Sequence, residues 1–295
     1  MSTPATRPRT RLDSLTGLRF LAAFVVFAFH SLHYGQQSLG NALFLAGTTG
    51  VSFFFIVSGV VMSWTARPGD RARDFYQRRF ARIYPAYAVA WASSLVVMLA
   101  QQRTPGLVDL LPLTLTQSWI PSDTYYWAAN AVFWTLSCEA FFYLTFPLLH
   151  RWTSRWSTAA AVSAVVVVVG LVEVLAVATA SRAGDPVVYW ATAVFPLTRL
   201  AEFVIGVLLG LLLVRGLTWT VPLWVASAIA LLAFLGASHV PDGYRDVAVT
   251  LLPFALLVWA AAQADLAGRR SVFRRRSLVV LGTWFGTRTF RRESA

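Results

Sequence analysis

An arginine and a histidine stand eleven residues apart in the first long apolar stretch of the chain, Arg19 near its start and His30 near its end. Eleven residues of α-helix advance about 16 Å and return to nearly the same side. One helix face would therefore carry a guanidinium and, about three turns further on, an imidazole. Imidazole titrates near neutral pH, which suits a general base or proton carrier. The alternatives are a snorkelling arginine anchor and a histidine that is simply packed.

Three arginines, Arg78, Arg79 and Arg82, are grouped just before a later apolar stretch. Spacings of three and four residues allow them to share one helical surface. Guanidinium groups bind phosphate bidentately, so this group suits a clamp for a cytoplasmic nucleotide or coenzyme. Charge alone favours a second interpretation, anchoring beside anionic lipid headgroups.

An acidic residue, Glu139, lies within the aromatic run 133–143, directly after Ser137 and Cys138. An unpaired charge among aromatic side chains is costly, so we expect Glu139 to be protonated or paired, and to be functional rather than merely packed. We expect Cys138 to be a small packing residue rather than a nucleophile, because no neighbour in the sequence would lower its pKa.

A second acid, Glu202, follows Arg199 by three residues in another apolar stretch. The two side chains can neutralise one another, so a purely structural ion pair is the alternative to a chemical role. Pro196, just before this pair, is expected to kink the helix or open it. The sequence predicts no role for Glu173, an acid alone in a valine-rich stretch.

The elements that position these residues are predicted to be membrane-spanning helices. Of the 295 residues, 57% are hydrophobic and 13% are charged, and the mean hydropathy of +0.60 exceeds that of ordinary soluble domains. Apolar runs long enough to cross a hydrocarbon layer predict an all-α, polytopic helix bundle of about eight spans. The predicted spans are 18–34, 43–64, 83–101, 131–149, 157–180, 187–214, 219–238 and 247–267.

The arginines also predict an orientation, since basic residues favour the cytoplasmic side of a membrane. They group at 7–11, 67–82, 151–155, 215 and 269–276, whereas the opposite connections hold only Arg103, Arg182 and Arg245. We therefore expect a multi-pass protein of the plasma (inner) membrane with a cytoplasmic N-terminus. It would form one domain, 1–295, with a basic N-terminus at 1–17 and a basic tail at 268–295.

Charge and cysteine content exclude other classes. The net charge of +12 arises from these short connections, so nucleic-acid binding is not expected. The single cysteine excludes an internal disulfide and a cysteine-based metal site, and we expect no metal.

Together these segments resemble membrane-bound acyltransferase family 3, bacterial integral membrane proteins that acylate extracytoplasmic glycans, lipid-linked sugars and some small natural products. The similar segments are, in chain order, 12–19 with His30, 53–59, 79–85, 134–143 and 199–206. Each motif is weak alone, and their order and spacing make the set specific. The family usually has about ten spans, each of membrane-crossing length. The similarity ends after Leu281 and Gly282, and the apolar run 278–286 is too short to span, so we expect a chain truncated at its C-terminus.

The resemblance implies an O-acyltransferase that moves an acetyl or short acyl group from cytoplasmic acyl-CoA, a co-substrate rather than a bound cofactor, to a hydroxyl of a sugar or glycosylated acceptor. It implies that His30 is catalytic and that Glu139 orients it or binds the acceptor. It also implies donor binding by Arg19, Arg79 and Arg82, with supporting roles for Asp13, Ser137, Arg199 and Glu202. The alternatives are a transporter of small organic ions or acyl groups, which would release no free CoA, and an inactive truncated remnant.

Overall fold

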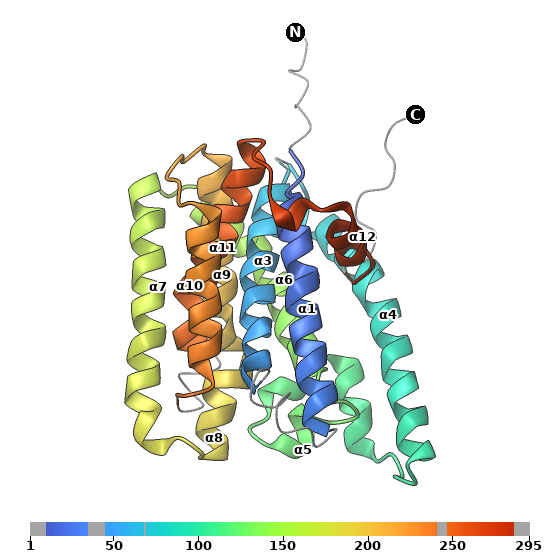
Figure 1. Ribbon diagram of the computed structural model, residues 1–295. Helices are drawn as coiled ribbons and strands as arrows, with labels where there is room; N and C mark the ends of the chain where they lie inside the picture. The colour runs from blue at the N-terminus through green and yellow to red at the C-terminus, as the bar shows by residue number, and fades with distance from the viewer. Residues whose placement is uncertain (1–9, 35–44, 68, 241–246, 286–295) are drawn as a thin grey trace.

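The computed structural model is a bundle of helices that stand side by side (Figure 1). It describes residues 10–34, 45–67, 69–240 and 247–285, and these ranges contain no strand. The long helices are α1 (Asp13–Tyr34), α3 (Gly50–Thr65), α4 (Ala72–Ala100), α6 (Trp134–Thr153), α7 (Thr158–Thr179), α9 (Pro196–Val214), α10 (Leu223–Ala237) and α11 (Val249–Leu266).

Short helical segments connect and cap the long ones. They are η1 (Leu45–Thr49), η2 (Leu107–Thr114), η3 (Gln117–Trp119), α5 (Asp123–Tyr126), η4 (Ala180–Arg182), α8 (Pro186–Tyr189), the π-helical η5 (Trp190–Val194), η7 (Val272–Arg274) and α12 (Arg276–Phe285). The start of α1 and the whole of α12 lie at one end of the bundle, and α5 and α8 lie at the other (Figure 1). We call these the α12 end and the α5 end.

The predicted polytopic helix bundle is confirmed. Within the described residues, six helical segments are long and apolar enough to cross a membrane, and α10 is a shorter apolar helix. Each of the eight predicted spans overlaps one long helix, although α6 is not among the six membrane-crossing segments. Large apolar side chains on α4 and α7 face outward, among them Val89 on α4 and Val166 and Val174 on α7, as expected for helices in contact with lipid.

Helix α4 differs from the prediction in where it begins. It starts at Ala72 rather than at residue 83, so Arg79 and Arg82 lie within a continuous helix and not before it. The segment 72–82 is too polar to appear in a search for apolar runs, but alanine, glutamine and arginine favour helix. Asp74 in the first turn also suits the positive end of the helix dipole.

The sixth predicted span is interrupted, as Pro196 predicted. The π turn η5 ends at Val194. The extended backbone of Phe195 (φ −64°, ψ 125°) then separates it from α9, whose first residue is Pro196. Hydroxyl groups satisfy carbonyls at the break, because Thr198 Oγ1 donates to Ala191 O at 2.6 Å and Thr192 Oγ1 donates to Val188 O at 2.8 Å.

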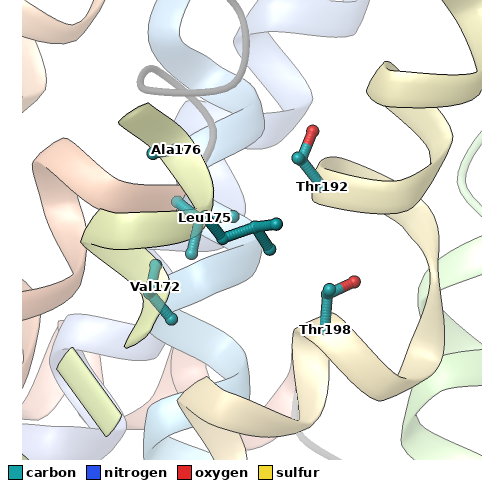
Figure 2. A pocket seen from close by; sticks show the side chains of 6 residues that line it. Val172, Leu175, Ala176, Thr192 and Thr198 are labelled. Atoms are coloured by element: carbon teal, nitrogen blue, oxygen red, sulfur yellow. The ribbon is translucent and has the colours of Figure 1, made fainter. Parts of the chain in front are cut away.

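A small cavity lies between the break and α7, with Thr192 and Thr198 on one side and Val172, Leu175 and Ala176 on the other (Figure 2). Its volume of about 20 Å³ gives room for one water molecule and not for a substrate. The cavity is therefore too small to be the substrate-binding site.

The centre of the bundle depends on glycines where α3 and α9 cross. A Cβ atom on Gly206 of α9 would overlap the carbonyl oxygen of Ile56, and one on Gly59 of α3 would overlap that of Phe203. The two backbones are thus in direct contact, a close approach that small residues permit between helices in membranes. Helix α9 is buried over most of its length as a result.

Gly206→Ala is expected to lower the free energy of unfolding by about 1–3 kcal/mol, the usual effect of an overpacked core, because α3 and α9 must separate. Thermal unfolding in detergent measures this effect. Gly170→Ala on α7 is the matched control, since a Cβ atom there meets nothing within 4 Å. Equal melting temperatures for Gly206→Ala and the parent protein would show that the helix crossing tolerates a methyl group.

The start of α1 is attached to the C-terminal part of the chain. Asp265 of α11 accepts hydrogen bonds from the Ser14 backbone N–H and from Ser14 Oγ, both at 2.7 Å, and lies 3.5 Å from Arg274 Nε. Glycines allow close packing here as well, because a Cβ atom on Gly282 of α12 would overlap the carbonyl of Thr16. These contacts set the position of α1, which carries Arg19 and His30.

Candidate active site

Helices α1 and α4 bring three arginines together near the α12 end. Arg19 lies near the start of α1, and Arg79 and Arg82, three residues apart, share one side of α4. The charge of Arg19 acts on both α4 arginines. All three side chains are half-buried. Three cations in one partly desolvated place favour binding of an anionic group. We call Arg19, Arg79 and Arg82 the arginine group.

Arg78 does not belong to this group. Its Nη2 lies 2.6 Å from Asp70 Oδ2 in an exposed ion pair before α4. The predicted shared surface therefore holds for Arg79 and Arg82, while Arg78 pairs with the preceding connection. This difference provides a matched control among neighbouring arginines.

Aromatic rings hold the guanidinium of Arg79 between α4 and α6. The guanidinium carbon lies 5.4 Å from the ring centroid of Phe75 and 5.8 Å from that of Tyr143. Both distances suit cation–π attraction. Arg79 is thereby directed toward α6, where Glu139 is located.

Glu139, which the sequence predicts to be protonated or paired, has a hydrogen-bond partner on its own helix. The Tyr143 hydroxyl, one turn further along α6, donates to Glu139 Oε2 at 2.7 Å. The Glu139 charge also acts on Arg79 and Arg82, so the carboxylate and the arginine group share one electrostatic environment. Within the described residues, no hydrogen bond to Glu139 Oε1 is found, and the side chain is only half-buried. Oε1 is therefore the oxygen that can meet a substrate.

His30 lies further toward the α5 end, about 16 Å along α1 from Arg19. Its Nδ1 is 2.8 Å from the carbonyl oxygen of Val26 in the preceding turn. Because a carbonyl only accepts hydrogen bonds, Nδ1 carries the proton and the neutral ring keeps a lone pair on Nε2. That tautomer is the one a general base requires. The contact that orients His30 among the described residues is thus Val26, whereas the resemblance offered Glu139 for this role.

Arg199 and Glu202 form a separate ion pair inside the bundle. Arg199 Nε lies 3.0 Å from Glu202 Oε2, and the two side chains are 1% and 0% exposed. Arg199 Nη2 donates to Ser52 Oγ of α3 at 3.3 Å, and its guanidinium lies over the rings of Phe55 and Trp134. The pair therefore joins α3, α6 and α9. This geometry agrees with a purely structural ion pair, the alternative to a chemical role.

The other two predicted supporting residues lie at helix starts. Asp13 is in the first turn of α1, 3.5 Å from Arg11 Nε. Ser137 Oγ donates to the carbonyl of Leu115 at 2.7 Å, which fixes the connection between α4 and α6 beside Glu139. Cys138 is fully buried and its Sγ meets the Val194 carbonyl at 3.3 Å, a packing position. No cluster of His, Cys, Asp and Glu suited to a metal ion occurs in the described part of the chain.

Two features of the site were not predicted. Tyr143 follows Glu139 by four residues, a spacing that brings side chains together on a helix, and that signal was available in the sequence. The attachment of Ser14 to Asp265 joins residues 251 positions apart, and no local pattern reports such a contact.

The fold and the site define a multi-pass membrane protein that carries a histidine on α1 and a group of half-buried arginines near a carboxylate. Comparison with known proteins specifies this class further. The acyltransferase-domain model of family 3 matches residues 12–290, and the chain belongs to that family. It is accordingly an acyltransferase, and the predicted family is confirmed.

Individual relatives agree with this assignment. The chain is 40% identical over 295 residues to the acyltransferase MdmB of Streptomyces mycarofaciens, covering 93% of this chain and 76% of that protein. It is 32% identical over 179 residues to nodulation protein 10 of Rhizobium leguminosarum bv. viciae, covering 52% and 48%. No solved structure matches the chain.

Proposed function

We propose that this protein is an O-acyltransferase that moves an acetyl or short acyl group from acyl-CoA to a hydroxyl of an extracytoplasmic glycan, glycolipid or glycosylated small molecule. The observation that carries the proposal is the arginine group beside Glu139, with a histidine base on the same α1 helix. Coenzyme A carries several phosphates, which suit guanidinium groups. Its pantetheine arm separates these phosphates from the thioester, as the 16 Å offset along α1 between Arg19 and His30 requires.

In the proposed reaction, His30 Nε2 takes the proton of the acceptor hydroxyl as its oxygen attacks the thioester carbonyl. The carbon–sulfur bond then breaks, and the departing CoA thiolate receives that proton from the imidazolium. Arg19, Arg79 and Arg82 hold the donor phosphates, and Glu139 Oε1 orients the acceptor. Asp13, Ser137, Arg199 and Glu202 keep the helices in place.

The proposed orientation follows from the arginine-bearing connections. Those after α3, α6, α9 and α11 lie at the α12 end, which basic residues favour as the cytoplasmic side. Acyl-CoA would then reach the arginine group from the cytoplasm of a bacterial cell, and the acceptor would reach His30 from the α5 end. The chain would act as one domain in the inner membrane, with no bound cofactor.

Reconstituted protein, supplied with labelled acetyl-CoA and cell-envelope fractions or glycosylated small molecules, tests the function. We expect labelled acceptor and one free CoA for each acyl group transferred. A carrier of acyl groups would release no CoA. The proposal would be contradicted if these substrates gave no labelled acceptor and no acceptor-dependent release of CoA.

Arg79→Gln is expected to raise the KM for acetyl-CoA roughly tenfold or more, with a smaller change in kcat. A hydrogen bond to a charged group contributes about 1.5–3 kcal/mol, and each 1.4 kcal/mol corresponds to a factor of ten. Initial rates at varied acetyl-CoA measure both constants. Arg78→Gln is the control, because Arg78 pairs with Asp70 on the surface. Equal KM values for the two variants would exclude Arg79 from the donor site.

A further inference from the structure

Tyr143 lies where three helices meet, and the roles assigned above do not include it. Its hydroxyl donates to Glu139 Oε2 on its own helix, α6, at 2.7 Å. The Arg79 guanidinium of α4 lies 5.8 Å from the ring centroid of Tyr143. Tyr143 thus contacts both the carboxylate and the arginine group.

These contacts are directional. The Tyr143 hydroxyl is the donor and Glu139 Oε2 is the acceptor. Because Oε2 is occupied, the rotation of the carboxyl group is fixed. Oε1, the other oxygen, then remains available to another partner.

We propose that Tyr143 is a positioning residue for acyl transfer: it holds the Glu139 carboxyl group rotated so that Oε1 meets the acceptor hydroxyl. This inference rests on the proposed function. Tyr143 itself touches no reactant, and its effect passes through Glu139. Its ring also supports Arg79, a contact that phenylalanine would preserve. Tyr143→Phe therefore separates the hydroxyl's contribution from that of the ring.

Tyr143→Phe is expected to lower kcat by roughly tenfold to a hundredfold, as loss of a hydrogen bond to a charged group does, while the KM for acetyl-CoA stays within about twofold. In a Glu139→Gln background the same change is expected to have little further effect on kcat, because the two residues act together. Initial-rate kinetics on the four proteins measure this cycle. Additive losses, or an unchanged kcat for Tyr143→Phe, would overturn the inference.

Tyr76→Phe is the matched control. The Tyr76 hydroxyl bridges α4 and α6, donating to the Leu144 carbonyl at 2.9 Å, and this hydrogen bond involves neither Glu139 nor the arginine group. Its loss likewise removes one tyrosine hydrogen bond to α6. We expect kcat within about twofold of the parent value. A loss equal to that of Tyr143→Phe would indicate a general effect on helix packing and overturn the positioning role.

A measurement without turnover keeps this inference distinct from the proposed function. Carbodiimides react with carboxyl oxygens that they can reach, so freeing Oε2 from the Tyr143 hydroxyl in Tyr143→Phe is expected to increase labelling of Glu139 several-fold, as peptide mass spectrometry would show. Tyr76→Phe should not change the labelling. Increased labelling in a protein that transfers no acyl group would contradict the proposed function and support the Tyr143 contact. Unchanged labelling would contradict the contact itself, whatever the activity.

Discussion

His30→Ala is expected to lower kcat for acyl transfer by about 10³-fold, within the usual range for loss of a general base. The Val26 carbonyl fixes the proton on Nδ1, so Nε2 is the atom that accepts the acceptor's proton. Removing the imidazole leaves the arginine group unchanged, and the KM for acetyl-CoA should stay nearly constant. Transfer of labelled acetyl to the acceptor measures the loss.

His239→Ala provides a close control for this variant. His239 also places Nδ1 near the carbonyl four residues before it, Leu235 O at 3.2 Å, but it is exposed after the end of α10. We expect its replacement to leave transfer unchanged. Added imidazole should restore part of the activity of His30→Ala by entering the space left by the side chain. Full transfer by His30→Ala alone would refute the proposed mechanism.

Arg199→Met is expected to lower the free energy of unfolding by about 3–5 kcal/mol, the usual result of breaking a buried ion pair. Glu202 is 0% exposed and would remain as a carboxylate deprived of its cation. The double variant Arg199→Met/Glu202→Leu removes both charges and should recover most of the stability, because well-packed apolar residues can replace a buried pair. Thermal unfolding of the three proteins in detergent measures the series.

Activity of the double variant then separates the two interpretations of this pair. We expect it to retain acyl transfer, because the pair joins α3, α6 and α9 and is enclosed by the rings of Phe55 and Trp134. A folded double variant without transfer would instead assign the pair a chemical role. A single variant as stable as the parent would show that Glu202 is neutral or solvated in the bundle.

Much of the fold follows from hydropathy alone. A helix that crosses a membrane must satisfy its own backbone hydrogen bonds and present apolar side chains to lipid, so each span leaves a long apolar run in the sequence. Each of the eight predicted runs overlaps one long helix. The break before α9 was also predictable, because a proline removes a backbone donor at Pro196. The polar first turns of α4 were not predicted as helix, because hydropathy indicates contact with lipid and not helix formation.

The sequence by itself determined the class of fold, the residue types suited to acyl transfer and the family to which they belong. Helical periodicity was sufficient to predict that Arg79 and Arg82 share one helix face and that Arg199 and Glu202 share another. Spacings of three or four residues place side chains on one face.

Only the tertiary structure decided which of these residues meet. It brought Arg19 of α1 and Glu139 of α6 within electrostatic range of Arg79 and Arg82 on α4. It also enclosed Arg199 and Glu202 apart, between α3 and α9. The physical reason is that helix rotation and crossing depend on contacts between distant segments, such as Gly206 with Ile56 and Ser14 with Asp265. Local periodicity carries no information about such contacts.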